Sequence, residues 1–287
     1  MTIVHDVLKE RRFADVAHRY DADDTILYAL GVGCGAARED MRYVYERGLE
    51  ALPSMATILA RADFWIADPE SGIDASRAVH GEEMVTLHEA VPAMGTVIGR
   101  THIEAIVDKG PGRPALLHLA RQVSEQATGR MLATVRSTVV LLGQGGFGGP
   151  RDAAPPRAAM PARPPDRVVD IPTLVQASFI YRLSGDRNPL HVDPEAARAA
   201  GFERPILHGL CTFGMVARAL VRHCCDDSPD RVREIGARFS APVYPGDVLR
   251  LAIWQRADRI RFRAFASGRH RAVLDHGTAR IGCTESR

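Results

Sequence analysis

The spacing of apolar residues predicts a long amphipathic helix in the second half of the chain. Apolar residues recur three or four positions apart at Leu210, Phe213, Ala217, Leu220 and Val221. This spacing is typical of a helix that buries one face. Arg218 and Arg222 fall on its wetter side, and the small residues Gly214 and Ala219 are expected to let the helix lie close against a sheet.

Strand-like runs follow this helix and also occur in the first half. They cover residues 103–107, 115–120, 134–142, 248–254 and 259–265. In the last run, arginines alternate with apolar residues, with Arg259, Arg261 and Arg263 on one side and Ile260, Phe262 and Phe265 on the other. Such alternation predicts antiparallel strands with one covered face.

Three segments of the first half recur in the same order in the second half, about 150 residues later. The pairs are Tyr28–Gly33 with Tyr181–Asp186, Pro53–Leu59 with Pro205–Cys211, and Ala90–Ile98 with Ala241–Leu249. Three ordered matches at nearly constant spacing predict a duplicated unit. A helix wrapped by an antiparallel sheet, made twice, is the expected α+β architecture. We place the repeats at residues 1–142 and 167–287, joined by residues 143–166.

The joining segment contains a motif that could suggest a dinucleotide site. Residues 143–148 formally satisfy GxGxxG after a predicted strand. A dinucleotide site needs a helix directly after the motif, with its N-terminus at the pyrophosphate. Pro150, Pro155 and Pro156 follow instead, so a flexible linker is the better interpretation.

Composition narrows the class of protein without naming a function. Lysine and arginine total 37 against 35 acidic residues, so the net charge of +2 gives no general case for binding nucleic acid or an anionic membrane. Five cysteines without a CxxC pair favour reduced thiols. No apolar stretch is long enough for a membrane span, and the first 20 residues lack the apolar region of a signal peptide. We expect a cytoplasmic protein, and the arginine bias is typical of GC-rich bacteria.

Titratable residues gather in one segment of the second repeat. Gly185 and Pro189 break any helix there, so Asp186, Asn188 and His191 are expected on one loop. Asp193 followed by Pro194 then predicts the start of a new helix that runs through Ala200. A carboxylate and an imidazole held by a rigid turn suit general acid/base work on a water molecule.

A purely structural interpretation of this segment remains open. Asp186 and His191 could simply form a turn with a capping histidine. The first repeat argues against this, because Gly33 and Arg38 stand at the equivalent positions. A pair needed only for folding should have been useful in both copies, whereas one catalytic pair suffices for one site.

The segment from Tyr181 to Ala197 resembles the signature of the hydratase 2 family, the MaoC-like (R)-specific enoyl-CoA hydratases. Similarity extends to Pro205–Gly214, Ala241–Gly246, His80-Gly-Glu82 and residues 145–149. Within this family, the chain resembles the double-hotdog hydratase domains of peroxisomal multifunctional enzyme type 2. The resemblance implies a double hotdog fold, a homodimer, hydration of trans-2-enoyl-CoA to (R)-3-hydroxyacyl-CoA, and no cofactor or metal.

The resemblance also implies roles for individual residues. Asp186 and His191 would form the catalytic dyad, Asn188 would orient it, and Glu46 falls where eukaryotic members carry a functionally important glutamate. A serine found in single-hotdog members is replaced here by Ala217, so no role for that hydroxyl is expected.

The thioester oxygen needs a donor as negative charge develops on it. Gly209 is predicted near a helix start, where its N–H has no partner within the helix, so it is the main oxyanion candidate. Arg182 and His208 are further substrate-binding candidates, although His208 is expected mainly as a structural hydrogen-bonding residue. Two alternatives remain: a dehydratase of 3-hydroxyacyl-CoA or acyl-carrier-protein thioesters, and a non-enzymatic acyl-CoA-binding module.

Overall fold

A single antiparallel sheet runs through the whole molecule. The computed structural model describes residues 3–62, 65–151 and 159–282. The strands are β1 (Val16–Tyr20), β2 (Ala78–Leu87), β3 (Gly95–Asp108), β4 (Ala115–Glu125), β5 (Met131–Leu141), β6 (Arg167–Pro172), β7 (Val232–Phe239), β8 (Val248–Arg256), β9 (Arg259–Ala266) and β10 (Ala272–Ile281). Every pairing between them is antiparallel.

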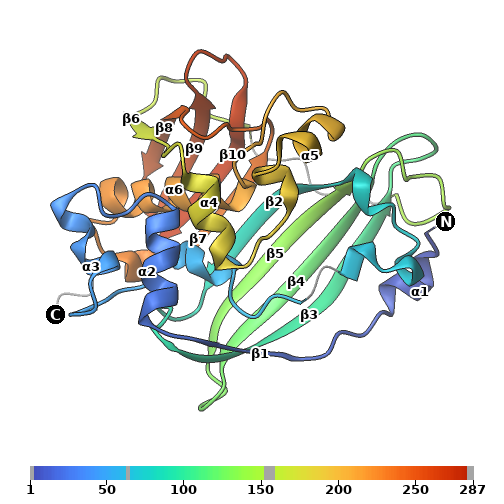
Figure 1. Cartoon of the computed structure of the whole chain (residues 1–287), viewed down its shortest axis with the longest axis horizontal. Helices are drawn as coiled ribbons and strands as arrows, with labels where there is room; N and C mark the ends of the chain where they lie inside the picture. Colours follow the sequence, from blue (N-terminus) through green and yellow to red (C-terminus); the bar gives the residue numbers. More distant parts are fainter. Residues whose placement is uncertain (1–2, 63–64, 152–158, 283–287) are drawn as a thin grey trace.

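The strand order confirms the duplication. It reads β1-β3-β4-β5-β2-β7-β10-β9-β8-β6. Counted outward from the centre, the first half has β2, β5, β4, β3 and β1, and the second half has β7, β10, β9, β8 and β6. Each strand of the first half therefore has an equivalent in the second half, and the equivalent strands follow one another in the same order along the chain. The equivalent strands β2 and β7 pair antiparallel, with Met84 opposite Gly236, so an approximate twofold axis relates the halves (Figure 1).

Most predicted strands are confirmed, with one side chain misplaced. All five predicted runs lie within β3, β4, β5, β8 and β9 apart from the single residue Leu142. In β9 the alternation is unbroken: Ala264 is buried and Phe265 is half-exposed on the arginine side. The prediction that Phe265 joins the covered face was wrong, because the regular pleat continues through the small residue Ala264.

The helices cluster mainly around the second half. They are α1 (His5–Lys9), α2 (Ala22–Gly31), α3 (Met41–Val44), α4 (Ala177–Tyr181), α5 (Pro194–Ala199) and α6 (Gly209–Cys224). Short 3-10 helices include η1 (Arg38–Asp40), η2 (Pro53–Thr57), η6 (Arg182–Ser184) and η7 (Pro189–His191). No helix in the described part of the chain is long and apolar enough to cross a membrane.

Helix α6 confirms the predicted amphipathic helix and forms the centre of the core. Leu210, Phe213, Leu220 and Val221 are all buried, and full burial of each such side chain contributes roughly 1.5–3 kcal/mol. Gly214 faces α2 and not the sheet: a Cβ there would lie 2.5 Å from a methyl carbon of Val32. The small residue therefore serves a close contact between α6 and the end of α2.

The first repeat lacks an equivalent long helix, which corrects the expectation of a helix at this position in both units. The segment that was aligned with the start of α6 forms only the 3-10 helix η2. Ala60 then adopts a left-handed conformation (φ 48°), and the apolar pattern ends at the polar Arg61. Without a continuing apolar face, the segment has no reason to extend as a helix.

The glycine-rich segment after β5 was predicted to be a flexible linker, but its described part is held in place by hydrogen bonds. Main-chain N–H groups of Gly146 and Gly148 donate to the buried Asp108 carboxylate at 2.7 and 2.8 Å. These bonds, with a third from Gly110, hold the pKa of Asp108 below its ordinary value despite burial. The first part of residues 143–166 is therefore fixed to the β3–β4 hairpin, and residues 152–158 lie outside the described part.

Candidate active site

A tightly turned loop carries the predicted catalytic residues. It follows α4 and η6, and Gly185 adopts a left-handed conformation (φ 114°) that reverses the chain. Asp186 Oδ1 accepts a hydrogen bond from the Asn188 N–H at 3.2 Å, and Asn188 Oδ1 accepts one from the Leu190 N–H at 3.0 Å. These two side-chain bonds fix the loop and start η7.

The helix after the loop begins as predicted. The Asp193 side chain accepts the Glu195 N–H at 2.8 Å, and Pro194 occupies the first turn of α5. The cap removes one unpaired donor at the helix start. The turn interpretation is therefore confirmed, because the loop is built from Asx turns. The same turns aim His191 inward.

His191 is 8% exposed and its orientation is fixed by one hydrogen bond. Its Nδ1 lies 2.8 Å from the main-chain oxygen of Ile206. Because a carbonyl only accepts, Nδ1 must carry the proton, which leaves Nε2 as the unprotonated nitrogen of the neutral ring. Burial lowers the pKa of His191, opposed by the Ile206 carbonyl and the Asp186 charge. The ring is thus a neutral base with a free lone pair.

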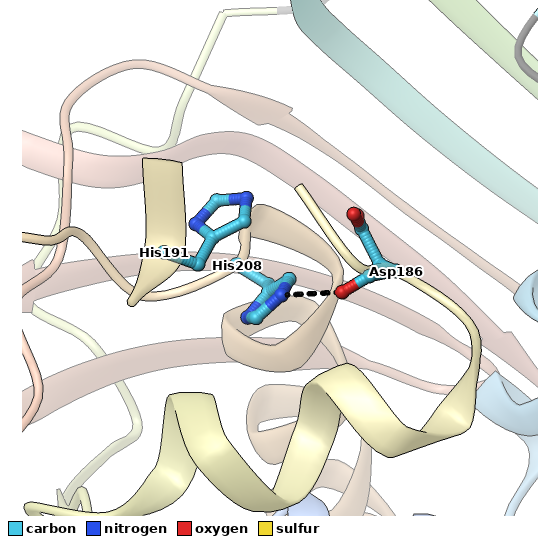
Figure 2. Close-up of side chains that lie close together, drawn as sticks. All are labelled: Asp186, His191 and His208. Atoms are coloured by element: carbon cyan, nitrogen blue, oxygen red, sulfur yellow. Dashed lines mark hydrogen bonds between the residues drawn. The ribbon is translucent and has the colours of Figure 1, made fainter. Parts of the chain in front are cut away.

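His208 joins the two members of the dyad. Its Nε2 donates to the main-chain oxygen of Asp186 at 3.2 Å (Figure 2), and its ring stacks on His191 with centroids 3.7 Å apart and an angle of 27°. The ring of Tyr181 lies on it at 5.1 Å. Burial, and then the neighbouring His191, lower the pKa of His208 to about 4. His208 therefore stays neutral while it contacts both Asp186 and His191.

The stacking of the two imidazole rings does not favour a shared metal ion in this cluster. Potential ligand atoms of Asp186, His191 and His208 lie within 4.8 Å of one another. Imidazole binds metals through lone pairs in the ring plane. Two rings stacked at 27° direct those lone pairs side by side and not toward one point. A shared ion would require the stack to rotate.

Gly209 lies where the sequence predicts an oxyanion donor. It is the first residue of α6, and the first intrahelical bond observed runs from the Thr212 N–H to the His208 oxygen. The Gly209 N–H therefore has no partner within the helix and lies at the positive end of the helix dipole. A Cβ at Gly209 would lie 3.2 Å from two ring carbons of Phe239, so that ring closely covers the glycine.

The remaining predicted site residues are only partly brought together. Asn188 is exposed and uses its oxygen to cap η7. Arg182 is half-buried in η6, close enough for its charge to help lower the pKa of His208. Glu46 lies exposed in the turn after α3 and does not belong to the cluster of Asp186, His191 and His208.

The equivalent position in the first repeat holds an ion pair that the sequence did not reveal. A Cβ at Gly33, which is aligned with Asp186, would lie 3.6 Å from Nη1 of Arg218. Arg218 donates to both carboxylate oxygens of the buried Asp40, at 3.2 and 2.6 Å. Arg218 had been expected on the wetter side of α6, yet its side chain is only 16% exposed. Only tertiary contact with the loop of the other repeat explains this burial.

Comparison with known proteins agrees with the duplicated fold. Residues 18–143 match the family described as MFE-2 hydratase 2 N-terminal domain, and residues 157–273 match the family described as MaoC like domain. The crystal structure of a MaoC-like dehydratase from Phytophthora capsici superposes with a TM-score of 0.85 at 29% identity, covering 96% of this chain and 98% of that one.

Two relatives align over most of their length. The chain is 40% identical over 264 residues to the 3-hydroxyacyl-thioester dehydratase Y of Mycobacterium tuberculosis, covering 88% of this chain and 90% of that protein. It is 31% identical over 288 residues to the peroxisomal enoyl-CoA hydratase 2 of Arabidopsis thaliana, covering 94% and 93%. The chain belongs to the MaoC-like hydratase 2 family and has the double hotdog fold that its sequence indicates.

Proposed function

We propose that this chain is a hydro-lyase that reversibly adds water to trans-2-enoyl-CoA and forms (R)-3-hydroxyacyl-CoA. The observation that carries the proposal is the buried, neutral His191 beside Asp186, with Nε2 free to accept a proton. Membership of a family that includes an enoyl-CoA hydratase 2 supports the substrate class. The (R) configuration follows from the family resemblance.

The dyad would activate one water molecule. The thioester carbonyl withdraws electrons through the double bond and makes C3 electrophilic. His191 Nε2 takes a proton from a water that the Asp186 carboxylate also holds, and the water oxygen bonds to C3. Negative charge moves to the thioester oxygen, and a proton delivered by the dyad reaches C2. The net reaction adds one water molecule across the double bond.

The Gly209 N–H would stabilise the charge on the thioester oxygen. A donor fixed at a helix start needs no reorganisation during the reaction, and loss of such a donor typically costs about 3 kcal/mol of transition-state stabilisation. Arg182 would add positive charge near the substrate, and Asn188 would orient the dyad by fixing the loop. The exposed position of Glu46 gives no geometric support for a catalytic role.

Dehydration of a 3-hydroxyacyl thioester is the second candidate function. The relative at 40% identity is named a 3-hydroxyacyl-thioester dehydratase. The same dyad would serve both directions, because the forward and reverse reactions share one transition state. Coenzyme A and acyl-carrier-protein thioesters would differ in the carrier and not in the atoms that react.

The test of the proposed function is the loss of conjugated-thioester absorbance with crotonyl-CoA. We expect Asp186→Asn and His191→Ala each to lower kcat/KM at least ~100-fold, the usual scale for positioned acid/base groups. Asp170→Asn on β6 and His88→Ala just beyond β2, both at exposed positions, should keep the activity of the unmodified chain. If both dyad variants turn over normally, the site lies elsewhere. If the unmodified chain binds crotonyl-CoA without turnover, the chain is a binding module.

We also propose a cytoplasmic homodimer. Cys34, Cys211, Cys224 and Cys225 are buried as free thiols, as expected in a reducing compartment. Val175 and Phe179 near the catalytic loop are largely exposed apolar side chains, which are common at subunit interfaces. Sedimentation equilibrium should give about twice the chain mass of 31.3 kDa.

A further inference from the structure

The first repeat contributes a second imidazole–carboxylate pair close to α6. The pair consists of His80 and Glu83 on β2, within the motif region that the family resemblance singled out without a role. A register shift between His80 and Glu82 brings both side chains to one face of the strand. His80 Nε2 lies 2.8 Å from a carboxylate oxygen of Glu83 and 3.1 Å from the main-chain oxygen of Glu82.

The Glu83 carboxylate is a rigid support for the His80 ring. Glu83 is only 2% exposed, and its oxygen also accepts the Ser137 hydroxyl of β5 at 2.6 Å. The main-chain oxygen of Glu82 can only accept, so Nε2 must carry the proton and donate it. A ring held through Nε2 by two fixed acceptors has little freedom to rotate. The His80 side chain itself remains 31% exposed.

The His80 ring packs on the residue that covers Gly209. Phe239 ends β7, next to β2 at the junction of the two repeats. Its ring centroid lies 4.7 Å from that of His80. The same ring also lies against Gly209, where a Cβ would meet two Phe239 carbons at 3.2 Å. One aromatic ring therefore connects the His80–Glu83 pair to the proposed oxyanion donor.

We propose that His80 is a positioning residue for the active site of the second repeat. Held by Glu83, its ring keeps Phe239 against Gly209 and so defines the space through which a thioester oxygen reaches the Gly209 N–H. The inference deepens the proposed function and rests on it. It also gives the first repeat a part in the reaction, although that repeat lacks the dyad.

A double-mutant cycle between His80 and Phe239 tests the inference. We expect His80→Ala and Phe239→Leu each to lower kcat/KM for crotonyl-CoA about 10-fold, since small displacements of positioning groups have effects of this order or larger. The loss should lie mainly in kcat, because the oxygen binds its donor most strongly in the transition state. The double variant should lose about as much as one single variant, because both act through the same ring.

Conservative replacement of Glu83 separates positioning from general destabilisation. Glu83→Gln keeps an acceptor for His80 Nε2 and should retain most activity, whereas Glu83→Ala should match His80→Ala. His88→Ala removes an exposed imidazole just beyond β2 and should have no effect. Titration with the unreactive butyryl-CoA counts correctly folded sites in each variant, so a folding defect appears as reduced stoichiometry.

The outcomes are distinguishable from failure of the proposed function. Losses that multiply to about 100-fold in the double variant, or full activity of His80→Ala, would overturn the positioning role. In either case an inactive Asp186→Asn variant would leave the proposed function standing. A fully active Asp186→Asn variant would remove the proposed function itself.

Discussion

At the residue scale, one hydrogen bond decides which nitrogen of His191 is available for chemistry. The Ile206 carbonyl takes the Nδ1 proton, so Nε2 carries the lone pair. His208 then stacks on the same ring and donates to Asp186. Ile206 and His208 lie outside the loop in sequence. They set which nitrogen of His191 is protonated and how His191 and Asp186 are oriented.

The lowered pKa of His191 predicts the acid side of the pH profile. A base must be neutral to act, and burial lets the neutral form persist below the ordinary value of 6.5. We expect the acid-side decline of kcat/KM for crotonyl-CoA to have its half-maximal point below pH 6.5. A half-maximal rate at or above pH 6.5 would contradict this, and the residual activity of His191→Ala should lack the acid limb.

Gly209 gives a second prediction at this scale. Gly209→Ala should fold normally, because the residue begins an ordinary helix, but its methyl group would press on the Phe239 ring. We expect at least a ~10-fold loss of kcat/KM, a fraction of the loss on removing an oxyanion donor. The Gly209→Ala, Phe239→Leu double variant should lose less than the product of the two single losses if crowding is the cause. Circular dichroism provides the folding control.

At the element scale, the two repeats use equivalent positions differently. In the second repeat, the turn after α4 presents Asp186. In the first repeat, the turn after α2 has Gly33, and Arg218 of α6 reaches to it and pairs with Asp40. The position equivalent to Asp186 in the first repeat therefore lies beside a buried ion pair that ties α6 to that repeat.

This ion pair predicts a large stability effect. Arg218→Met removes the cation from Asp40, whose side chain is 4% exposed, and should lower the free energy of unfolding by about 3–5 kcal/mol. Arg222→Met breaks the more exposed pair with Glu39 and should have a much smaller effect on the free energy of unfolding. Urea denaturation measures both. Equal effects of the two substitutions would contradict the buried pairing, and adding Asp40→Asn to Arg218→Met should recover part of the loss.

At the scale of the whole molecule, one sheet is covered by unequal helices. The 16-residue α6 covers the second repeat, whereas the 5-residue η2 stands at the corresponding place in the first. We expect the first repeat, which has the shorter element at this place, to accommodate a long acyl chain.

The asymmetry predicts the acyl-chain preference. Octenoyl-CoA and a branched enoyl-CoA should be hydrated with kcat/KM at least equal to that of crotonyl-CoA, because added methylene groups gain burial worth about 0.8 kcal/mol each where apolar surface is available. A steady-state series of chain lengths with the unmodified chain measures this. Turnover confined to four-carbon substrates would contradict the prediction.

The sequence by itself determined the duplicated fold and the loop. Apolar residues recur every two positions in a strand and every three to four positions in a helix, because of the local backbone geometry. The strands and α6 could therefore be predicted from the sequence. The Asp193 cap and the turn at Gly185 are likewise local. Their signals lie within a few residues of the structure that they specify.

Only the tertiary structure decided how distant residues meet. The stack of His208 on His191, the burial of Arg218 against Asp40 and the chain of contacts from Glu83 to Gly209 join positions that no sequence spacing relates. The shortness of η2 and the close contact of Gly214 with the end of α2 also depend on packing between distant segments. Such contacts are fixed by how the two repeats close on each other, because burial and partner choice are properties of the assembled core.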